Sequence, residues 1–440
     1  FHIFFREPPF KGGYAIASGM DHIAEVVENF SFSDESVEYL ASIDAPGGGK
    51  LFNPGFLEYL RTLELTVEID AVREGTVVFP NDPIVRVTGP IVQCQLLETQ
   101  LLNCVNFETL AATKAARVCL AAETPVAEFG LRRAQGESGG CASTSNVLAG
   151  REYGLPVSGT HAHAWVMAFD DELEAFRAYA KEFPTNCVLL VDTYDVTQGM
   201  KNAITVGLEM KARGEHLAGI RIDSGDLAWN AKQARTMLDE AGLTDTGVVL
   251  SNDLDEFAIK SIRDSGAKVA SWGVGTKLVT AYDQPALGGV YKLAAKRMKG
   301  GEWKPCVKVT GQSSKQTVPG ILDVRRYFHE SGTIAGDMVF DVLYPVSSER
   351  IVDPANELRQ KDLSGLRYET LLEPLARAGK VVLDAEARDA LVARDRCRKQ
   401  LALLDESQKR IVNPHSYPVG LEYSLFYRRR DLVSRLLGLS

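Results

Sequence analysis

Residues 217–242 read LAGIRIDSGDLAWNAKQARTMLDEAG and carry the strongest information about the fold. An apolar, strand-like run opens the stretch and ends in a polar cluster that contains Arg221, Asp223 and Asp226. An amphipathic helical pattern follows and closes with Gly242, a residue that favours a helix C-terminus. Because parallel strands need a crossover connection, a strand and a helix in this order predict one βα unit of a parallel sheet.

The same pattern recurs on both sides of this stretch. Apolar runs end in polar clusters in CVLLVDTYD (187–195), GVVLSNDLD (247–255) and KVASWGVGT (268–276). The first aspartates of three clusters, Asp192, Asp223 and Asp253, are spaced 31 and 30 residues apart, which is one βα unit each. Polar residues only at the carboxyl ends of strands are typical of α/β barrels. Because these strands end in acids and arginine and lack GxGxxG, a barrel is favoured over a doubly wound sheet.

Bulk composition narrows the class of protein. The chain of 440 residues is too long for one core, and we expect the parts 1–124, 125–288 and 289–440. A net charge of -9 argues against non-specific nucleic-acid binding. No apolar run is long enough to span a membrane, and no signal peptide opens the chain. Seven cysteines without a CxxC pair predict reduced cytoplasmic thiols, without zinc or a disulfide framework, and no flavin is expected.

Two clusters suit a phosphorylated sugar. Arg221 offers the bidentate geometry that binds phosphate or carboxylate, and Asp223 suits ribose hydroxyls or Mg²⁺. The alternative is an Arg–Asp pair that closes the strand, with Asp226 capping the following helix. In GVGT (273–276), glycines let backbone N–H groups approach a phosphate and Thr276 adds a hydroxyl, although an ordinary glycine turn would look the same.

FGLRRAQG (129–136) sets an aromatic ring beside two arginines. On a strand, Phe129 and Arg133 would share one face and Arg132 would lie on the other. An aromatic face with a guanidinium suits a flat aromatic acid, whereas structural ion pairing is the alternative for one arginine.

GLPVSGTHAHAWVMAF (154–169) reads as a strand-like run that ends in His161 and His163. If the segment is extended, both rings lie on one face. A histidine near carboxylates can act as a nucleophile or an acid–base group, although a packed or solvated histidine is more common. The residues alone do not choose between the two.

Nine segments in order resemble the nicotinate phosphoribosyltransferase family, and together they cover most of the chain. They are FFREPPFKGGYAIASG (4–19), EFGLRRAQG (128–136), TSNVLAG (144–150), GTHAHAWV (159–166), DTYDVTQGMKNAI (192–204), RIDSGDL (221–227), VVLSNDLDE (248–256), GVGTKLVTAYDQPALGGVYKL (273–293) and KQTVPG (315–320). The resemblance implies an irregular, incomplete α/β barrel beside an N-terminal α+β domain, with a C-terminal strand and helix extension. It also implies a homodimer whose subunits share active sites.

The resemblance implies a reaction as well. Nicotinate and phosphoribosyl pyrophosphate would give nicotinate mononucleotide and pyrophosphate, with Mg²⁺ and coupled hydrolysis of ATP through a phosphohistidine, in NAD salvage. His163 falls on the histidine of the family's GTxAH motif and would carry the phosphoryl group, and Arg221 and Asp223 would complete the catalytic set. Substrate-binding residues would be Tyr14, Phe129, Arg132, Thr160, Ser224, Gly225, Asn252, Asp253, Gly273, Gly275 and Thr276.

Two departures from the family pattern and several rivals stay open. An Asp-Leu-Tyr segment usually precedes FFR, and a longer loop usually follows RRAQG, where Gly136–Ala142 here runs almost directly into STSN. We therefore expect further residues before Phe1, and the loop is either short or lacks residues here. The nearest rival is nicotinamide phosphoribosyltransferase, followed by a barrel aldolase or isomerase with Lys277 as its lysine. A non-catalytic nucleotide-binding module is the remaining alternative.

Overall fold

The computed structural model describes residues 1–134, 143–309 and 316–439. The chain forms two compact units, one built from residues 1–109 and 286–440 and the other from residues 110–285. We call them unit 1 and unit 2. The division falls inside the long helix α4 (Ile91–Ala122). The predicted three-part division stays a prediction.

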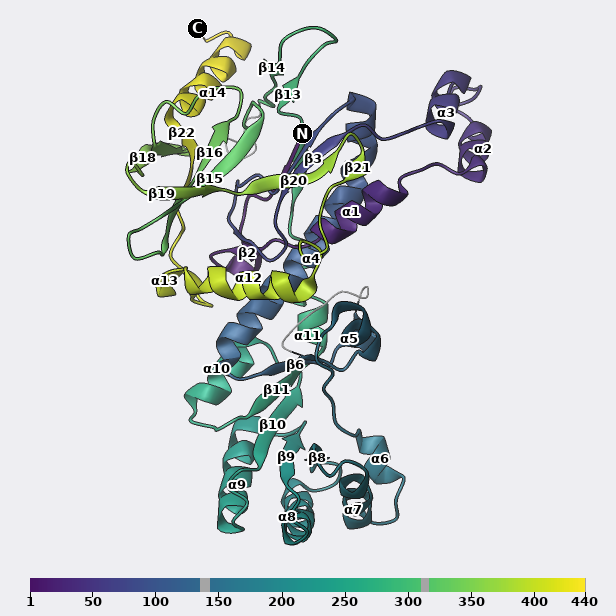
Figure 1. Ribbon diagram of the computed structural model, residues 1–440, viewed down its shortest axis with the longest axis vertical. Coiled ribbons are helices and arrows are strands. Elements are labelled where there is room, and N and C mark those ends of the chain that lie inside the picture. Colours follow the sequence, from purple (N-terminus) through teal and green to yellow (C-terminus); the bar gives the residue numbers. More distant parts are fainter. Residues whose placement is uncertain (135–142, 310–315, 440) are drawn as a thin grey trace. The chain divides into compact units, whose positions relative to one another are not determined.

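Unit 2 contains the parallel sheet, and its elements alternate along the chain as the sequence predicts. The strands are β6 (Val126–Glu128), β7 (Ser143–Thr144), β8 (Cys187–Leu190), β9 (Leu217–Ile222), β10 (Gly247–Asn252) and β11 (Ser271–Val274). The helices are η2 (Leu131–Arg133), α5 (Val147–Tyr153), α6 (His163–Met167), α7 (Glu172–Glu182), α8 (Val196–Ala212), α9 (Leu227–Glu240), α10 (Glu256–Asp264) and α11 (Thr276–Val279). Figure 1 shows α8, α9 and α10 alongside the strands that they connect.

The sheet of unit 2 is an open half-barrel. Its strand order is β7-β6-β11-β10-β9-β8, and every pair is parallel. Beyond β7, Thr144 makes one further parallel bridge to Val157. A closed barrel would join the Val157 side to β8, and no such pair exists in the part of the chain that the structure describes. The incomplete barrel is thus confirmed, and β8 is an edge strand.

Aspartates begin the helices that follow the strands. Asp195 caps α8, Asp226 caps α9 and Asp255 caps α10, and each carboxylate accepts a backbone N–H from the first turn. These bonds satisfy donors that a helix N-terminus leaves unpaired. The predicted capping role of Asp226 is confirmed. In each of these three clusters, therefore, the second aspartate stabilises a helix, and the first does not take part in capping.

Two further segments differ from their predicted structures. Residues 155–159 are not a strand, because Val157 makes only the single bridge to Thr144. The segment through Phe129 and Arg133 turns into the short helix η2, so the prediction that these two residues share one strand face is wrong. In both cases the local apolar pattern was too short to indicate which tertiary partners were available.

Within the described residues, unit 1 combines helices and two two-stranded sheets with two six-stranded sheets, one antiparallel and one mixed. The antiparallel sheet has the order β12-β1-β5-β3-β20-β21 and the mixed sheet β18-β17-β22-β16-β15-β19. The strands are β1 (His2–Phe4), β2 (Ala15–Ile16), β3 (Glu68–Val72), β4 (Val77–Val78), β5 (Val85–Thr88), β12 (Val290–Lys292), β13 (Ala295–Lys296), β14 (Lys304–Pro305), β15 (Leu322–Phe328), β16 (Ile334–Asp341), β17 (Arg350–Asp353), β18 (Asn356–Asp362), β19 (Arg367–Thr370), β20 (Leu372–Arg377), β21 (Lys380–Val381) and β22 (Val419–Glu422).

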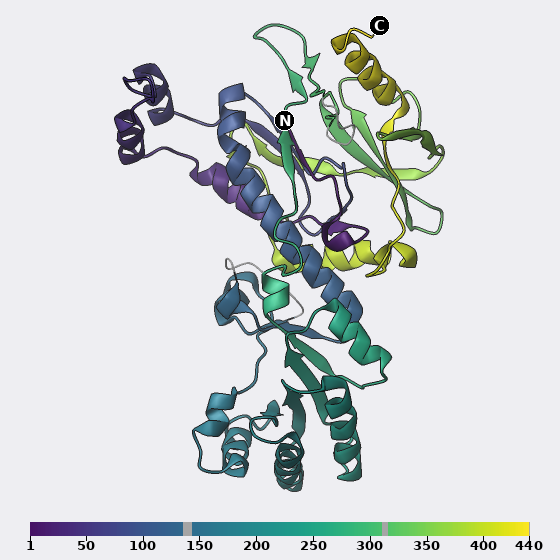
Figure 2. The same cartoon turned by 180° about the vertical axis from the view of Figure 1, so that it is seen from behind.

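The helices of unit 1 lie in its N-terminal and C-terminal parts. They are η1 (Pro9–Lys11), α1 (Met20–Asn29), α2 (Asp34–Ser42), α3 (Pro54–Arg61), α12 (Ala390–Ala402), α13 (Glu406–Lys409) and α14 (Tyr423–Leu436). In both views, α2 and α3 stand apart from the sheets of this unit (Figures 1 and 2). No helix in the described parts of the chain is both long and apolar enough to cross a bilayer.

A buried polar cluster joins chain segments of unit 1 that are far apart in sequence. Arg326 on β15 pairs with Asp337 on β16 through two hydrogen bonds of 3.0 and 2.6 Å, and the Tyr417 hydroxyl donates to the same carboxylate at 2.8 Å. Asp82 accepts the Phe79 N–H at 2.9 Å. Burial and the neighbouring Asp337 carboxylate raise the pKa of Asp82 well above its ordinary value, which favours the protonated form of Asp82 in the folded protein.

Replacing Asp82 by asparagine is expected to stabilise the protein increasingly as the pH rises. Because the pKa of Asp82 is higher in the folded state than in the unfolded chain, the unfolded chain releases this proton at lower pH, and the wild type loses stability as the pH rises above about 3.8. An amide keeps the shape and the donor without this cost. We expect a clear gain in the free energy of unfolding at pH 8 and little gain at pH 4. Urea unfolding at the two pH values measures it, with exposed Asp170→Asn as the control; an equal effect at both pH values would contradict the protonated state.

Candidate active site

Arg221 is the centre of a hydrogen-bonded group at the carboxyl edge of the half-barrel. From β9, its guanidinium donates to Ser251 Oγ at 2.7 Å, Thr160 Oγ1 at 2.8 Å and Asp223 Oδ1 at 3.0 Å. The same guanidinium lies over the ring of Phe129, 5.3 Å from its centroid. Residues from four separate segments of unit 2 therefore meet at one side chain.

These contacts orient the guanidinium and leave it capacity for a ligand. A guanidinium carries five N–H donors, and three of them are bonded to oxygens of the described residues. Two donors remain, in the planar fork that matches a phosphate or carboxylate. Arg221 is largely buried, and Asp223, at the edge of the group, is more accessible. The arrangement can bind an anion at Arg221 and place a carboxylate beside it.

The loop after β9 is held by Asp192, which follows β8. Asp192 Oδ2 accepts the Asp223 N–H at 2.8 Å and the Ser224 hydroxyl at 2.6 Å. Gly225 completes the turn with a φ of +74°, a conformation that favours glycine. The loop thus presents Asp223 and Ser224 in a defined geometry. Sequence reasoning placed Asp192 in the right cluster but did not predict this supporting role.

The two histidines occupy different environments. His163 begins α6, and its Nδ1 lies 3.2 Å from the Thr193 hydroxyl, while its Nε2 lies 3.8 Å from Asp223 Oδ2. The His163 side chain is 40% exposed, so a ligand can reach it. His161 is buried, and its Nε2 accepts the Leu190 N–H at 3.1 Å. Because Thr193 occupies Nδ1 of His163, Nε2 is the nitrogen available to a reactant.

Phe129 explains why glycine is needed at position 273. A Cβ on Gly273 would lie 2.5 Å from two carbons of the Phe129 ring. The ring therefore packs directly on the backbone of β11, and a side chain at residue 273 would displace it. A Cβ on Gly275 would lie 3.2 Å from the Phe129 carbonyl oxygen, which is also close. These two glycines thus have a packing reason in addition to the predicted phosphate contact.

Beyond β11, Thr276 and Lys277 have partners that sequence reasoning missed. Arg133 donates to Thr276 Oγ1 at 2.7 Å, which brings a second guanidinium to the GVGT segment. Lys277 pairs with Asp255 at 2.7 Å, and this hydrogen bond raises the pKa of the lysine. A lysine that forms a Schiff base must be neutral, and desolvation or another cation normally achieves this. The ion pair argues against the aldolase alternative.

Several predicted residues lie outside the Arg221 group. Arg132 is exposed on η2, and Asp253 is exposed directly after β10. Asn252, the last residue of β10, has a φ of 129°, which is a strained conformation for a residue with a side chain. Strained backbone of this kind is often found at functional sites. Tyr14 belongs to unit 1 and is buried there. The predicted loop 136–142 lies outside the described residues.

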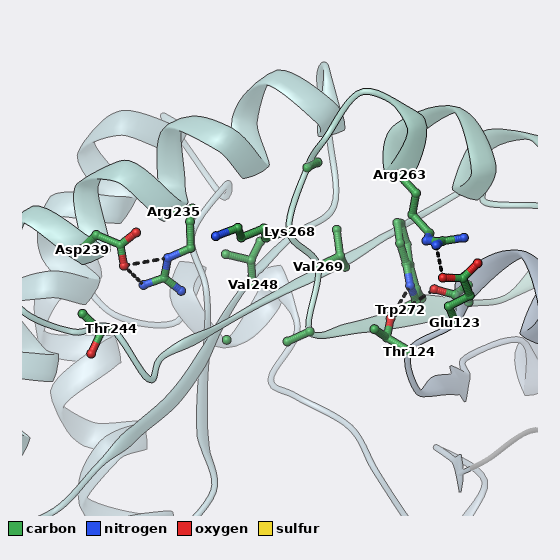
Figure 3. Close-up of a pocket in the computed structure, with 14 residues that line it drawn as sticks. Glu123, Thr124, Arg235, Asp239, Thr244, Val248, Arg263, Lys268, Val269 and Trp272 are labelled. Atoms are coloured by element: carbon green, nitrogen blue, oxygen red, sulfur yellow. Dashed lines mark hydrogen bonds and ion pairs between the residues drawn. The ribbon is translucent and has the colours of Figure 1, made fainter.

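A cavity lies at the other end of the same strands, their amino-terminal end. The cavity, of about 580 Å³, is bordered by Gly247 at the start of β10 and by Ala270 just before β11. Figure 3 shows Arg235 turned toward Asp239 and Arg263 toward Glu123, and both pairs are bonded. These arginines also donate to backbone carbonyl groups of neighbouring loops. Since its arginines are already paired, we assign this end of the strands to stability rather than to catalysis.

Comparisons with known proteins agree with this geometry. A crystal structure of human nicotinic acid phosphoribosyltransferase superposes with a TM-score of 0.81 at 29% identity, covering 98% of this chain and 95% of that one. A nicotinate-nucleotide pyrophosphorylase structure from Pyrococcus furiosus shares the fold, with a TM-score of 0.66, 20% identity and coverage of 91% and 88%. The half-barrel of unit 2 and the sheets of unit 1 are thus the fold of type II phosphoribosyltransferases.

Sequence comparisons define the family. Residues 1–106 match the nicotinate phosphoribosyltransferase N-terminal domain, residues 126–328 the nicotinate phosphoribosyltransferase family and residues 323–428 its C-terminal domain. The nicotinate phosphoribosyltransferase of Bacillus subtilis is 42% identical over 438 residues, with 96% of this chain and 87% of that protein covered. The human enzyme is 33% identical, with coverage of 97% and 90%. The chain belongs to the nicotinate phosphoribosyltransferase family and is an enzyme of that class.

Proposed function

We propose that the chain transfers the phosphoribosyl group of phosphoribosyl pyrophosphate to nicotinate, as the first step of NAD salvage. Family membership over most of the chain supports the reaction. The observation that carries the site assignment is the group around Arg221, in which Thr160, Ser251 and Asp223 bond one guanidinium that also lies over Phe129. An aromatic ring, a cation and a carboxylate in one group suit a flat aromatic acid and a phosphorylated ribose together.

The proposed chemistry follows from the charges that develop. The nitrogen of nicotinate forms a bond to C1 of the ribose while the bond from C1 to the pyrophosphate oxygen breaks, so positive character grows on the sugar and negative charge on the leaving group. Asp223 would stabilise the cationic sugar and Arg221 the phosphate oxygens. Phe129 would stack on the nicotinate ring, with Arg132 near its carboxylate. Asn252, Asp253, Gly275 and Thr276 would bind the remaining phosphoribosyl oxygens.

His163 would link this reaction to ATP. Its Nε2 would attack the γ-phosphorus of ATP, forming an N–P bond as the bond to ADP breaks, and water would later release phosphate. Thr193 supports the assignment, because it engages the other ring nitrogen. Asp223 lies 3.8 Å from Nε2, so its carboxylate would be repelled by a phosphoryl group bound there. This repulsion would connect ATP hydrolysis to the pyrophosphate site.

Mg²⁺ would be bound mainly through substrate phosphates. Within residues 1–134, 143–309 and 316–439, no three or more His, Cys, Asp or Glu side chains could together hold a metal ion. Such a cage is unnecessary, because Mg²⁺ on phosphates needs only one or two protein carboxylates. Asp223 and Asp253 would supply them, and the ion would neutralise charge on the leaving pyrophosphate. We further propose a cytoplasmic homodimer with shared active sites.

Pyrophosphate release tests the proposal. We expect release with nicotinate at a kcat/KM at least about 100-fold above that with nicotinamide, and a further increase with ATP and Mg²⁺. Preference for nicotinamide would assign the rival activity. Binding of phosphoribosyl pyrophosphate without pyrophosphate release from either base would instead indicate a non-catalytic binding module.

A further inference from the structure

His161 lies at the open edge of the half-barrel. On one side β8 pairs with β9, and on its other side no strand pairs with it in the described part of the chain. An unpaired backbone N–H at a buried edge is costly. The Leu190 N–H of β8 instead donates to His161 Nε2 at 3.1 Å, so a side chain takes the place of the missing strand.

The His161 ring is held in one orientation. It is 7% exposed and packs edge-on against Tyr179 of α7, with centroids 4.7 Å apart, and it also contacts Phe176. Burial lowers the pKa of His161 to about 4, so the ring is neutral in any ordinary assay. Since Nε2 accepts a hydrogen bond, Nδ1 carries the proton, 3.4 Å from the Ala162 carbonyl oxygen.

This geometry excludes one role for His161 and indicates another. A ring nitrogen that accepts a buried N–H has no free lone pair, so His161 cannot take a phosphoryl group in place of His163. On either side of His161, Thr160 accepts a hydrogen bond from Arg221 at 2.8 Å and His163 Nδ1 lies 3.2 Å from Thr193 Oγ1. Three side chains of segment 160–163 therefore attach it to β9, to β8 and to the loop that follows β8.

We propose that His161 is a positioning residue, which anchors segment 160–163 to the edge strand β8 and so holds His163 Nε2 beside Asp223. The proposal rests on the proposed role of His163. Without the His161 anchor, the segment would lose its hydrogen bond to β8 and keep those of Thr160 and His163. His163 would then sample positions away from Asp223, and the link between ATP hydrolysis and product formation would weaken.

Two variants separate positioning from packing. His161→Phe keeps an aromatic ring among Phe176 and Tyr179 but has no acceptor for the Leu190 N–H. His161→Gln carries an amide oxygen at about the reach of Nε2 and restores the acceptor. We expect the Phe variant to fold, with a midpoint of thermal unfolding within about 5 °C of the wild type. Should it fail to fold, His161→Leu, which also lacks the acceptor, takes its place.

The measurements are kcat and KM for nicotinate and the ratio of phosphate to pyrophosphate released. For the Phe variant we expect kcat to fall about 10-fold or more, KM to change less than about 3-fold, and the ratio to rise as ATP is hydrolysed without product. The Gln variant should recover most of kcat and the wild-type ratio. Wild-type kcat and ratio in the Phe variant, or equal losses in both variants, would overturn the proposal.

Hydrogen exchange distinguishes failure of this proposal from failure of the proposed function. The Leu190 amide should exchange slowly in the wild type and the Gln variant and faster in the Phe variant, whatever the reaction is. If the wild type does not couple ATP hydrolysis to product formation, the proposed role of His163 is wrong. The difference in kcat between the Phe and Gln variants then tests the positioning role of His161. Unchanged protection of the Leu190 amide in the Phe variant would contradict the hydrogen bond from Leu190 to His161 and with it the proposed anchor.

Discussion

Replacing Arg221 by alanine is expected to lower kcat/KM for pyrophosphate release on the order of 10³-fold while leaving the protein folded. The substitution removes three hydrogen bonds at once, those to Ser251, Thr160 and Asp223, together with the cation over Phe129. It also removes the positive charge that would face the phosphate oxygens. Arg221→Lys should restore little, because an ammonium group cannot form the planar fork that meets three partners.

Arg235 offers a matched control on the same sheet. It too forms several hydrogen bonds, to Asp239, Thr246 and Leu243, but at the opposite edge. Arg235→Ala should lower the free energy of unfolding by about 1–3 kcal/mol and leave kcat/KM near the wild-type value. If both alanine variants lose stability alike and neither loses activity selectively, the catalytic assignment of the Arg221 group is wrong.

Replacing His163 by alanine is expected to lower the rate of ATP hydrolysis coupled to product formation by at least about 100-fold. Pyrophosphate formation should continue at a reduced rate, because the Arg221 group is intact in this variant. Thr193, which engages Nδ1, and Asp223, close to Nε2, would remain in place. Acid-labile and alkali-stable radioactivity from γ-labelled ATP should appear on the wild type and be absent from the variant.

His216 is the matching histidine control, since it is exposed and directly precedes β9 at the far edge of the sheet. His216→Ala should retain label and coupling. Coupled ATP hydrolysis that survives unchanged in His163→Ala would exclude the phosphohistidine at this residue and would require another acceptor.

Much of unit 2 could be predicted because its information is local. The spacing of Asp192, Asp223 and Asp253 reflects the length of one strand and one helix, and Asp226 caps the helix that it directly precedes. Apolar periodicity and glycine at helix ends are likewise properties of a few neighbouring residues. The prediction of a strand over residues 155–159 is wrong because a run of five residues contains too little periodicity to specify a partner strand.

The sequence by itself determined the parallel βα series, the edge at which polar residues gather and the family. Only the tertiary structure decided which of those residues act as one group. Arg221 meets Thr160 from 61 positions away, and Phe129 packs on Gly273. Likewise, His161 and His163 look equivalent in GTHAH, yet one is a buried acceptor for β8 and the other faces Asp223. Such contacts depend on how strands are placed side by side, which no local pattern specifies.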